Sequence, residues 1–257
     1  MTLSFIISGF AVGVLVGLTG VGGGSLMTPL LTLLFGVPPS VAVGTDLAFA
    51  SITKATGTFT HRLRGTVEWP VVRLLCLGAL PAAILTTIGI HYFGGIDDSA
   101  TKFIRYSIGI SVLLTVVALI FRSKLLAWII KHPQYQLEGR NLAIATIISG
   151  AILGILVTIS SIGAGAIGAT LLVLLYPKMP PAHIAGTDIA YAVPLTAIAA
   201  LGHWWLGSIN WELLGSLLIG SLPGITLGAL AAKAVPEKIL RGILATTLTL
   251  VAFKLVS

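Results

Sequence analysis

Charged residues are scarce in this chain. Of its 257 residues only 9% are Asp, Glu, Lys or Arg, whereas 56% are hydrophobic, and the mean hydropathy is +1.05. A soluble domain carries about 25% charged residues, so these few could not solvate a globular surface of this size. The composition excludes a soluble protein and indicates a polytopic, all-α membrane protein. Its uncharged runs are long enough to cross a hydrocarbon core about 30 Å thick.

Cysteine is nearly absent as well, which limits the chemistry. The single Cys76 excludes an intrachain disulfide and a cysteine metal cluster. The stretch GVGGGSLM lacks the lysine of a nucleotide-binding phosphate loop. No nucleophile–base or metal constellation is visible, so we expect no enzyme activity, no metal and no cofactor. The net charge of +7 lies mostly between apolar runs, without a basic patch interleaved with aromatic residues, and nucleic acid is not an expected partner.

The sequence contains two similar halves. GVLVGLTGVGGGSLMTPLLTLLF, from Gly13, aligns with GILVTISSIGAGAIGATLLVLLY, from Gly154. PPSVAVGTDLAFA, from Pro38, aligns with PPAHIAGTDIAYA, from Pro180. The alignment then continues without gaps through five matched pairs: His61 and His203, Gly65 and Gly207, Trp69 and Trp211, Gly78 and Gly220, and Pro81 and Pro223. This agreement predicts a duplication, with a first repeat at 1–121, a polar connector at 122–141 and a second repeat at 142–257.

Each repeat contains five apolar elements. We expect them at 3–20, 24–35, 42–61, 70–91 and 101–121, and again at 142–159, 165–176, 184–205, 211–231 and 237–256. The second element of each repeat has about 12 residues, each with a 1.5 Å rise, which is too short to span comfortably. We therefore expect it to form either a re-entrant helical hairpin with the first element or a broken helix, followed by three transmembrane helices. The connector could lie along the membrane surface or be a plain linker.

The distribution of basic residues favours repeats of opposite orientation. If each hairpin returns to its starting side, the Lys- and Arg-bearing segments at 62–73, 122–140, 178 and 233–241 fall on one side. The acidic loop GGIDDS falls on the other side. If the broken helix crosses the membrane once, the repeats are parallel and the last basic segment moves outside. The positive-inside rule favours the inverted arrangement.

Glycine and small residues interrupt both hairpins. Non-helical backbone at membrane depth is tolerated only where it is buried in protein or lines a wet cavity. A helix that restarts there presents unpaired N–H groups and a partial positive charge. Inverted symmetry would bring the two breaks together near the midplane, where they could bind an anion. The alternative is that the glycines only allow tight helix packing. The candidate binding residues at the breaks are Thr19, Gly22, Gly23, Gly24 and Ser25 in the first repeat, and Ser160, Ser161, Gly163 and Gly165 in the second.

These motifs resemble those of the sulfite exporter TauE/SafE family, also called 4-toluene sulfonate uptake permeases. The resemblance rests on the GxxxGLxGxGGGxxxxPLL opening, the following VGT, the duplicated GT…G(N/T/S)(V/I)xW pattern and the G…P pair. It covers nearly the whole chain and implies transport of sulfite, sulfonates or related organosulfur anions, with proton coupling commonly assumed. Where many members have a small hydroxyl residue after GT, this chain has Asp46 and Asp188.

Ionisable residues inside membrane segments are functional candidates. Asp46 and Asp188 occupy equivalent positions and could cap the third helices or carry protons. Lys54 stands where the second repeat has Thr196; it is the candidate for recognising substrate charge, or it pairs with a carboxylate on another helix. His61 and His203 could shuttle protons or lie at the membrane interface.

The sequence therefore predicts a multi-pass protein of the cell membrane. We expect a secondary transporter for a small sulfur-containing anion such as sulfite, thiosulfate, sulfoacetate or taurine. Coupling to protons and rocking of one repeat against the other are the expected mechanism. A passive anion channel of the same fold is the alternative. The oligomeric state stays open, with a homodimer among the options.

Overall fold

The protein is all-helical over the residues that its computed structural model describes, which are 2–19, 24–92, 98–132, 134, 136–231 and 246. The predicted last element at 237–256 lies outside these residues, apart from Thr246. The helices of the described residues are α1 (Thr2–Thr19), α2 (Gly24–Leu34), α3 (Pro39–Leu63), α4 (Trp69–Tyr92), α5 (Asp98–Lys131), α6 (Gly139–Ser160), α7 (Ala166–Leu175), α8 (Pro181–Trp205) and α9 (Trp211–Ala231).

Five of these helices are long and apolar enough to cross a membrane: α4, α5 from Phe103, α6, α8, and α9 as far as Gly228. Helix α3 is as long as α8, at 25 residues, and both carry an aspartate and a histidine, but α3 also carries Lys54 and Arg62. Helix α5 runs on to Lys131, so the first half of the segment expected as a connector at 122–141 is helical. With 34 residues, α5 is about 51 Å long at a rise of 1.5 Å per residue.

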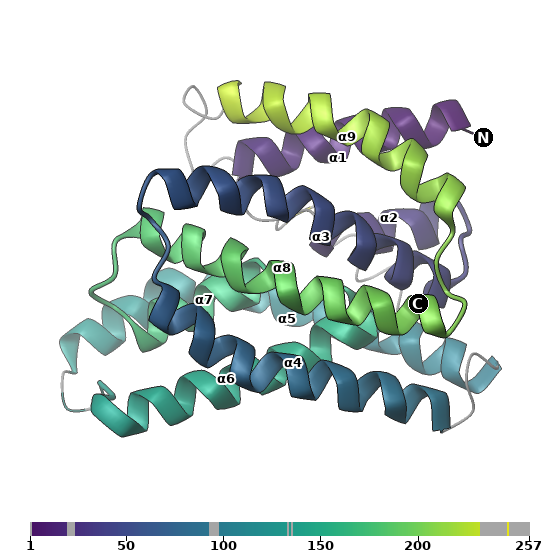
Figure 1. Ribbon diagram of the computed structural model, residues 1–257. Coiled ribbons are helices and arrows are strands. Elements are labelled where there is room, and N and C mark those ends of the chain that lie inside the picture. Colours follow the sequence, from purple (N-terminus) through teal and green to yellow (C-terminus); the bar gives the residue numbers. More distant parts are fainter. Residues whose placement is uncertain are drawn as a thin grey trace.

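Two helices of equivalent sequence, α3 and α8, pack against each other in the centre of the bundle (Figure 1). The pair α1 and α9 packs on one side of this centre, and the pair α4 and α6 on the other. The fully buried side chains Leu47, Phe49, Tyr191 and Leu195 all come from α3 and α8. The polar residues of these two helices are therefore placed in the middle of the protein.

Glycines allow the two outer helix pairs to approach closely, and the same contacts occur in both pairs. A Cβ atom on any of these glycines would overlap backbone atoms of the partner helix, so only glycine fits. In the α1–α9 pair, Gly9, Gly13 and Gly220 face Leu217, Ser221 and Ile6; in the α4–α6 pair, Gly150, Gly154 and Gly78 face Leu75, Ala79 and Ile147. Each contact in one pair joins positions that align with those of a contact in the other.

Helices α3 and α8 run antiparallel, as two reciprocal hydrogen bonds demonstrate. The N–H of Asn210, just after α8, donates to Thr45 Oγ1 near the start of α3 at 3.1 Å. The N–H of Glu68, just after α3, donates to Thr187 Oγ1 near the start of α8 at 3.0 Å. Each helix begins with a proline at its first residues and is followed by a glycine of positive φ, Gly65 at 66° and Gly207 at 71°.

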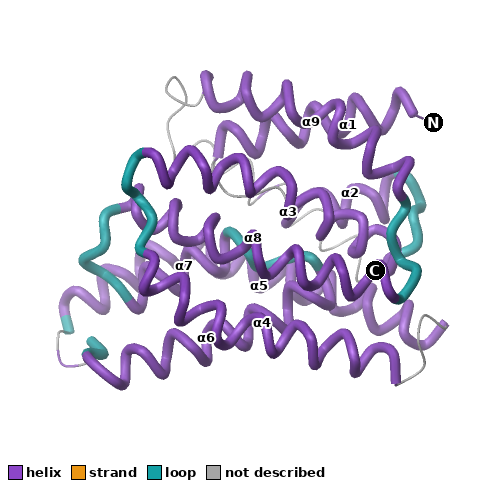
Figure 2. The backbone as a smooth tube through the Cα atoms, in the orientation of Figure 1, coloured by secondary structure: helices purple, strands orange, loops and turns teal. Residues whose placement is uncertain are grey.

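In both hairpins the second helix returns toward the end at which the first begins. The rings of Phe5 in α1 and Phe35, just after α2, have centroids 4.9 Å apart. The hydroxyl of Tyr176, just after α7, is 2.8 Å from Thr146 Oγ1 in α6. Figure 2 shows the connecting loops gathered at the two ends of the bundle and one further short loop among the helices, the segment 161–165 between α6 and α7.

Candidate functional site

The segment 161–165, which joins α6 to α7, has backbone geometry that few residues adopt. Ser161 has a φ of 58°, and Gly163 and Gly165 have φ values of 125° and 145°. Positive φ values of this size are readily available only to glycine, which explains the two glycines. The N–H of Ser161 donates to Val157 O at 2.7 Å and closes the end of α6. The hydroxyl of Ser160 donates to Leu156 O at 2.7 Å and accepts from the N–H of Ile162 at 3.2 Å.

Three ionisable side chains of the central helices converge on this segment and on the start of α7. Asp46 and Lys54 come from α3, and Asp188 comes from α8. Their exposed fractions are only 0%, 5% and 3%. Burial of charge at this depth is costly unless it is paired or hydrogen-bonded, so their partners decide what the site can do.

Asp46 ties three parts of the chain together. Its Oδ2 accepts a hydrogen bond from Thr28 Oγ1 in α2 at 2.6 Å and another from Ser161 Oγ at 3.0 Å. The capping interpretation of Asp46 and Asp188 is wrong. Helices α3 and α8 begin at Pro39 and Pro181, about two turns before Asp46 and Asp188. The two aspartates therefore lie inside their helices and not at the first turn, where a capping residue stands.

Lys54, about two turns after Asp46 in α3, contacts the same segment 161–165. Its ammonium group donates to Ala164 O at 2.6 Å. It interacts electrostatically with both aspartates. Among the residues that the structure describes, no ion pair within 4 Å joins Lys54 to either carboxylate. A buried cation therefore lies at the non-helical segment and is held by a backbone carbonyl.

The other predicted site residues lie apart from Lys54 or outside the described part. The Nε2 atom of His203, which is buried, is 2.9 Å from Thr158 O in α6, and the Nδ1 atom of His61, which is half-buried, is 2.8 Å from Thr66 Oγ1. Gly24 begins α2, while Gly22 and Gly23 lie outside the described residues, as do the side chains of Thr19 and Ser25.

Three residues of the site were not anticipated: Thr28, Gly168 and Tyr191. Thr28 bonds Asp46, while Asp188 Oδ1 and the Tyr191 hydroxyl both lie beside Gly168. A signal was present in the alignment of the repeats, where Gly168 stands opposite Met27 and Tyr191 opposite Phe49. At these equivalent buried positions the second repeat has a small or polar residue where the first has an apolar one.

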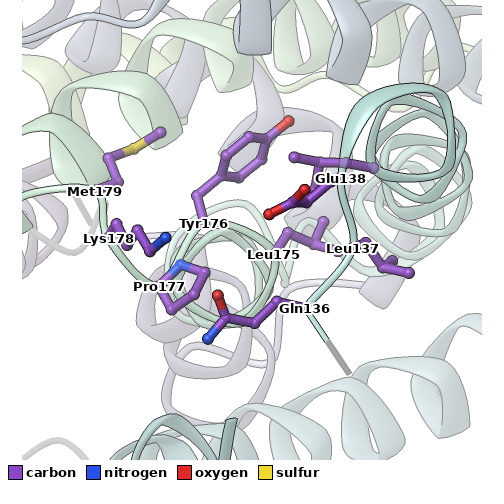
Figure 3. Close-up of a pocket in the computed structure, with 9 residues that line it drawn as sticks. Gln136, Leu137, Glu138, Leu175, Tyr176, Pro177, Lys178 and Met179 are labelled. Carbon is purple, nitrogen blue, oxygen red and sulfur yellow. The ribbon is translucent and has the colours of Figure 1, made fainter. Parts of the chain in front are cut away.

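Two cavities of the described residues lie away from the site. They lie near the ends of the bundle, one of about 470 Å³ lined by Phe35, Asn210 and Glu212 among others, and one of about 230 Å³ (Figure 3). The second is lined by loop residues before α6 and after α7, and the charged side chains in it are Glu138 and Lys178. Neither cavity is lined by Asp46, Lys54 or Asp188.

Thr28→Ala is expected to lower the free energy of unfolding by about 1.5–3 kcal/mol, because it removes a hydrogen bond to a buried, charged group. Thr32→Ala is the matched control on the same helix, since its hydroxyl bonds only to Thr28 O one turn earlier. Thermal unfolding followed by tryptophan fluorescence measures both variants. Equal melting temperatures for the two would contradict the role given to Thr28.

Comparison with known proteins decides the family. The family model described as sulfite exporter TauE/SafE matches residues 5–255. The chain belongs to the sulfite exporter TauE/SafE family. A TauE/SafE relative from Bacillus subtilis (strain 168), "Probable membrane transporter protein YjnA", is 34% identical over 256 residues and covers 100% of both chains.

More distant TauE/SafE relatives carry similar names. "Probable membrane transporter protein YdhB" of the same organism is 27% identical over 240 residues, which are 90% of this chain and 91% of that protein. "Probable membrane transporter protein" of Xylella fastidiosa (strain Temecula1 / ATCC 700964) is 27% identical over 229 residues, covering 88% and 82%. No solved structure matches. This TauE/SafE member is thus a multi-pass integral membrane transporter.

Proposed function

We propose that the protein is a proton-coupled secondary transporter for a small sulfur-containing anion such as sulfite, thiosulfate, sulfoacetate or taurine. The anion binds at the break between α6 and α7, where Lys54 supplies positive charge and the start of α7 supplies backbone N–H groups. The observation that carries this proposal is the 2.6 Å contact of the Lys54 ammonium group with Ala164 O, at the non-helical segment.

The hydrogen bond of Lys54 supports a role in binding rather than in holding the fold. A neutral carbonyl is a weaker partner for an ammonium group than an oxyanion is. An anion entering the break could replace Ala164 O as the acceptor without leaving the lysine unpaired. The hydroxyls of Ser160 and Ser161 donate to Leu156 O and Asp46 in this conformation, and would have to rotate before they could bind the anion.

Electrostatics at the site supports proton coupling. Two carboxylates and one ammonium group leave this buried cluster with a net negative charge when all three are ionised. An anion would then be repelled, since charges interact strongly where water is excluded. Protonation of one carboxylate removes the excess negative charge, so the anion and a proton bind together. Because the proton cancels one negative charge, moving the anion together with a proton transfers less net charge across the membrane than moving the anion alone.

Reciprocal contacts support two inverted repeats that rock against each other. The antiparallel α3 and α8, the equivalent glycine contacts in the α1–α9 and α4–α6 pairs and the two returning hairpins fit a two-fold relation. The loops at 64–68 and 176–180 lie together at one end, with basic residues Arg64 and Lys178. The positive-inside rule places that end in the cytoplasm.

Liposome uptake tests the proposed function. Purified protein is reconstituted, and uptake of labelled sulfite, thiosulfate, sulfoacetate and taurine is followed with and without an imposed pH gradient. We expect accumulation of one of these anions above its equilibrium level, and loss of that accumulation when a protonophore collapses the gradient. Equilibration that ignores the gradient would favour a passive anion channel instead, and no uptake of any of the four would contradict the substrate class.

A further inference from the structure

The two repeats differ at adjoining buried positions around their aspartates. The first repeat has the buried residues Met27 and Thr28 in α2 and Phe49 in α3, and Thr28 contacts Asp46. At the aligned positions around Asp188, the second repeat has Gly168, Ala169 and Tyr191. The second repeat thus has no threonine and no methionine at these positions, and it has a hydroxyl group on Tyr191 where the first repeat has Phe49.

These exchanges leave Asp46 anchored. Thr28 donates to its carboxylate at 2.6 Å, Ser161 donates at 3.0 Å, and Met27 and Phe49 are fully buried. These two hydrogen bonds hold Oδ2 of Asp46 and offset part of the cost of burying its charge, whereas its Oδ1 is buried without a partner among the described residues. Asp46 therefore has a structural role in joining α2, α3 and the segment 161–165.

Around Asp188 the same exchanges place the Tyr191 hydroxyl nearby but no residue equivalent to Thr28 that donates a hydrogen bond to the carboxylate. Asp188 Oδ1 and the Tyr191 hydroxyl are both buried, and neither has a hydrogen-bond partner. Both oxygens lie within 2.5 Å of the point that a Cβ atom on Gly168 would occupy, so they are less than about 5 Å apart. Each unpartnered buried group costs about 1–3 kcal/mol, and more when it is charged, so an ionised Asp188 is costly at this position.

We propose that Asp188 is the site at which the coupling proton binds, with the hydroxyl of Tyr191 as its hydrogen-bond partner. The inference rests on the proposed function for the coupling itself and identifies which of the two aspartates performs it. A hydrogen bond between Asp188 and Tyr191 Oη can form in either ionisation state of the carboxyl, and the proton removes the buried negative charge that Asp188 would otherwise carry. The absence of a side chain at Gly168 provides the space in which the two groups meet.

The surrounding charges connect this proton to the anion. Lys54 from α3 and Arg122 from α5 interact electrostatically with Asp188, and Asp46 also interacts with Lys54. Cys76 from α4 interacts electrostatically with Tyr191. The described parts of α6 and α7 place no ionisable side chain beside Asp188. Neutralising Asp188 removes one of the two carboxylate interactions of Lys54, so that the ammonium group becomes available to the anion.

Infrared difference spectroscopy tests the assignment without needing a substrate. Reconstituted protein is titrated with acid, and the carbonyl stretching band of protonated carboxyl groups is recorded. Carboxyl groups at the ends of the helices contribute equally to all variants and cancel when variants are compared. We expect Asp188→Asn to lose one component of this band and Asp46→Asn to keep it. Tyr191→Phe is expected to shift that component, because the hydrogen bond is lost.

Tyr176→Phe is the matched control, since it removes a hydroxyl that bonds Thr146 instead and is expected to leave the component in place. Should Asp188→Asn fail to fold, Tyr191→Phe still decides, since phenylalanine is accommodated fully buried at the equivalent Phe49. Loss of the component in Asp46→Asn with retention in Asp188→Asn would overturn the assignment, as would an unshifted component in Tyr191→Phe. A proton on Asp188 together with no gradient-driven uptake in liposomes would instead refute the proposed function alone.

Discussion

Lys54→Ala is expected to weaken binding of the transported anion by about 10- to 100-fold. A hydrogen bond to a charged group contributes about 1.5–3 kcal/mol, and each 1.4 kcal/mol corresponds to about tenfold in affinity. Lys54 is buried at the break and held only by Ala164 O and long-range attraction to the aspartates. Concentration dependence of uptake in liposomes, for whichever of the four anions is transported, measures the change.

Thr196→Ala is the matched control for Lys54. Thr196 occupies the equivalent position in the second repeat, is also buried, and bonds only to Ala192 O and Val193 O of its own helix. Its replacement is expected to leave the affinity unchanged. If Lys54→Ala folds and transports with wild-type affinity, recognition of the anion's charge must lie at another residue.

Gly78→Ala and Gly220→Ala are expected to be strongly destabilising, each by at least the 1–3 kcal/mol typical of overpacking. A Cβ atom at Gly78 would overlap Ile147 O and Ala151 N of α6, and one at Gly220 would overlap Ile6 O and Phe10 N of α1. The overlapping atoms are helical backbone, which cannot move aside as a side chain can. Thermal unfolding of the purified protein is the measurement.

Each of these variants has a control on the same helix. At Gly89 of α4 and Gly215 of α9, among the described residues and apart from the helix's own adjoining turns, no atom lies within 4 Å of the position that a Cβ atom would take. Alanine at either position is expected to leave the melting temperature unchanged or to raise it, because alanine favours a helix over glycine by up to about 1 kcal/mol. Similar losses for Gly78→Ala and Gly220→Ala support the equivalence of the two helix pairs. A loss in only one of them would contradict it.

The helices were largely predictable from the sequence, because apolar runs and glycine or proline residues mark their ends. The expected elements at 24–35 and 165–176 correspond to α2 at Gly24–Leu34 and α7 at Ala166–Leu175. The predicted helix ends were wrong where polar residues were taken to mark the end of a helix. The start of α3 was expected at 42 and lies at Pro39, and α5 continues through the basic residues after 121 to Lys131. Polarity marks the limit of the membrane, and a helix does not need to end there.

The candidate site was predictable in its ionisable residues but not in its partners. Asp46, Lys54 and Asp188 are conspicuous because charge is rare in apolar segments. Asp46 is bonded by Ser161, which is 115 positions away, and Lys54 by Ala164, which is 110 positions away. Such pairings depend on how α3 crosses the α6–α7 break, and this crossing has no local signal in the sequence.

The most direct test of the binding site is to locate the anion. Selenite is a heavier oxyanion of the same chemical group as sulfite, and its selenium can be identified in crystals of the protein by anomalous scattering. We expect a selenium peak within hydrogen-bonding reach of the Lys54 ammonium group and the start of α7. A peak confined to the cavity beside Lys178 and Glu138 at the end of the bundle would contradict the proposed site.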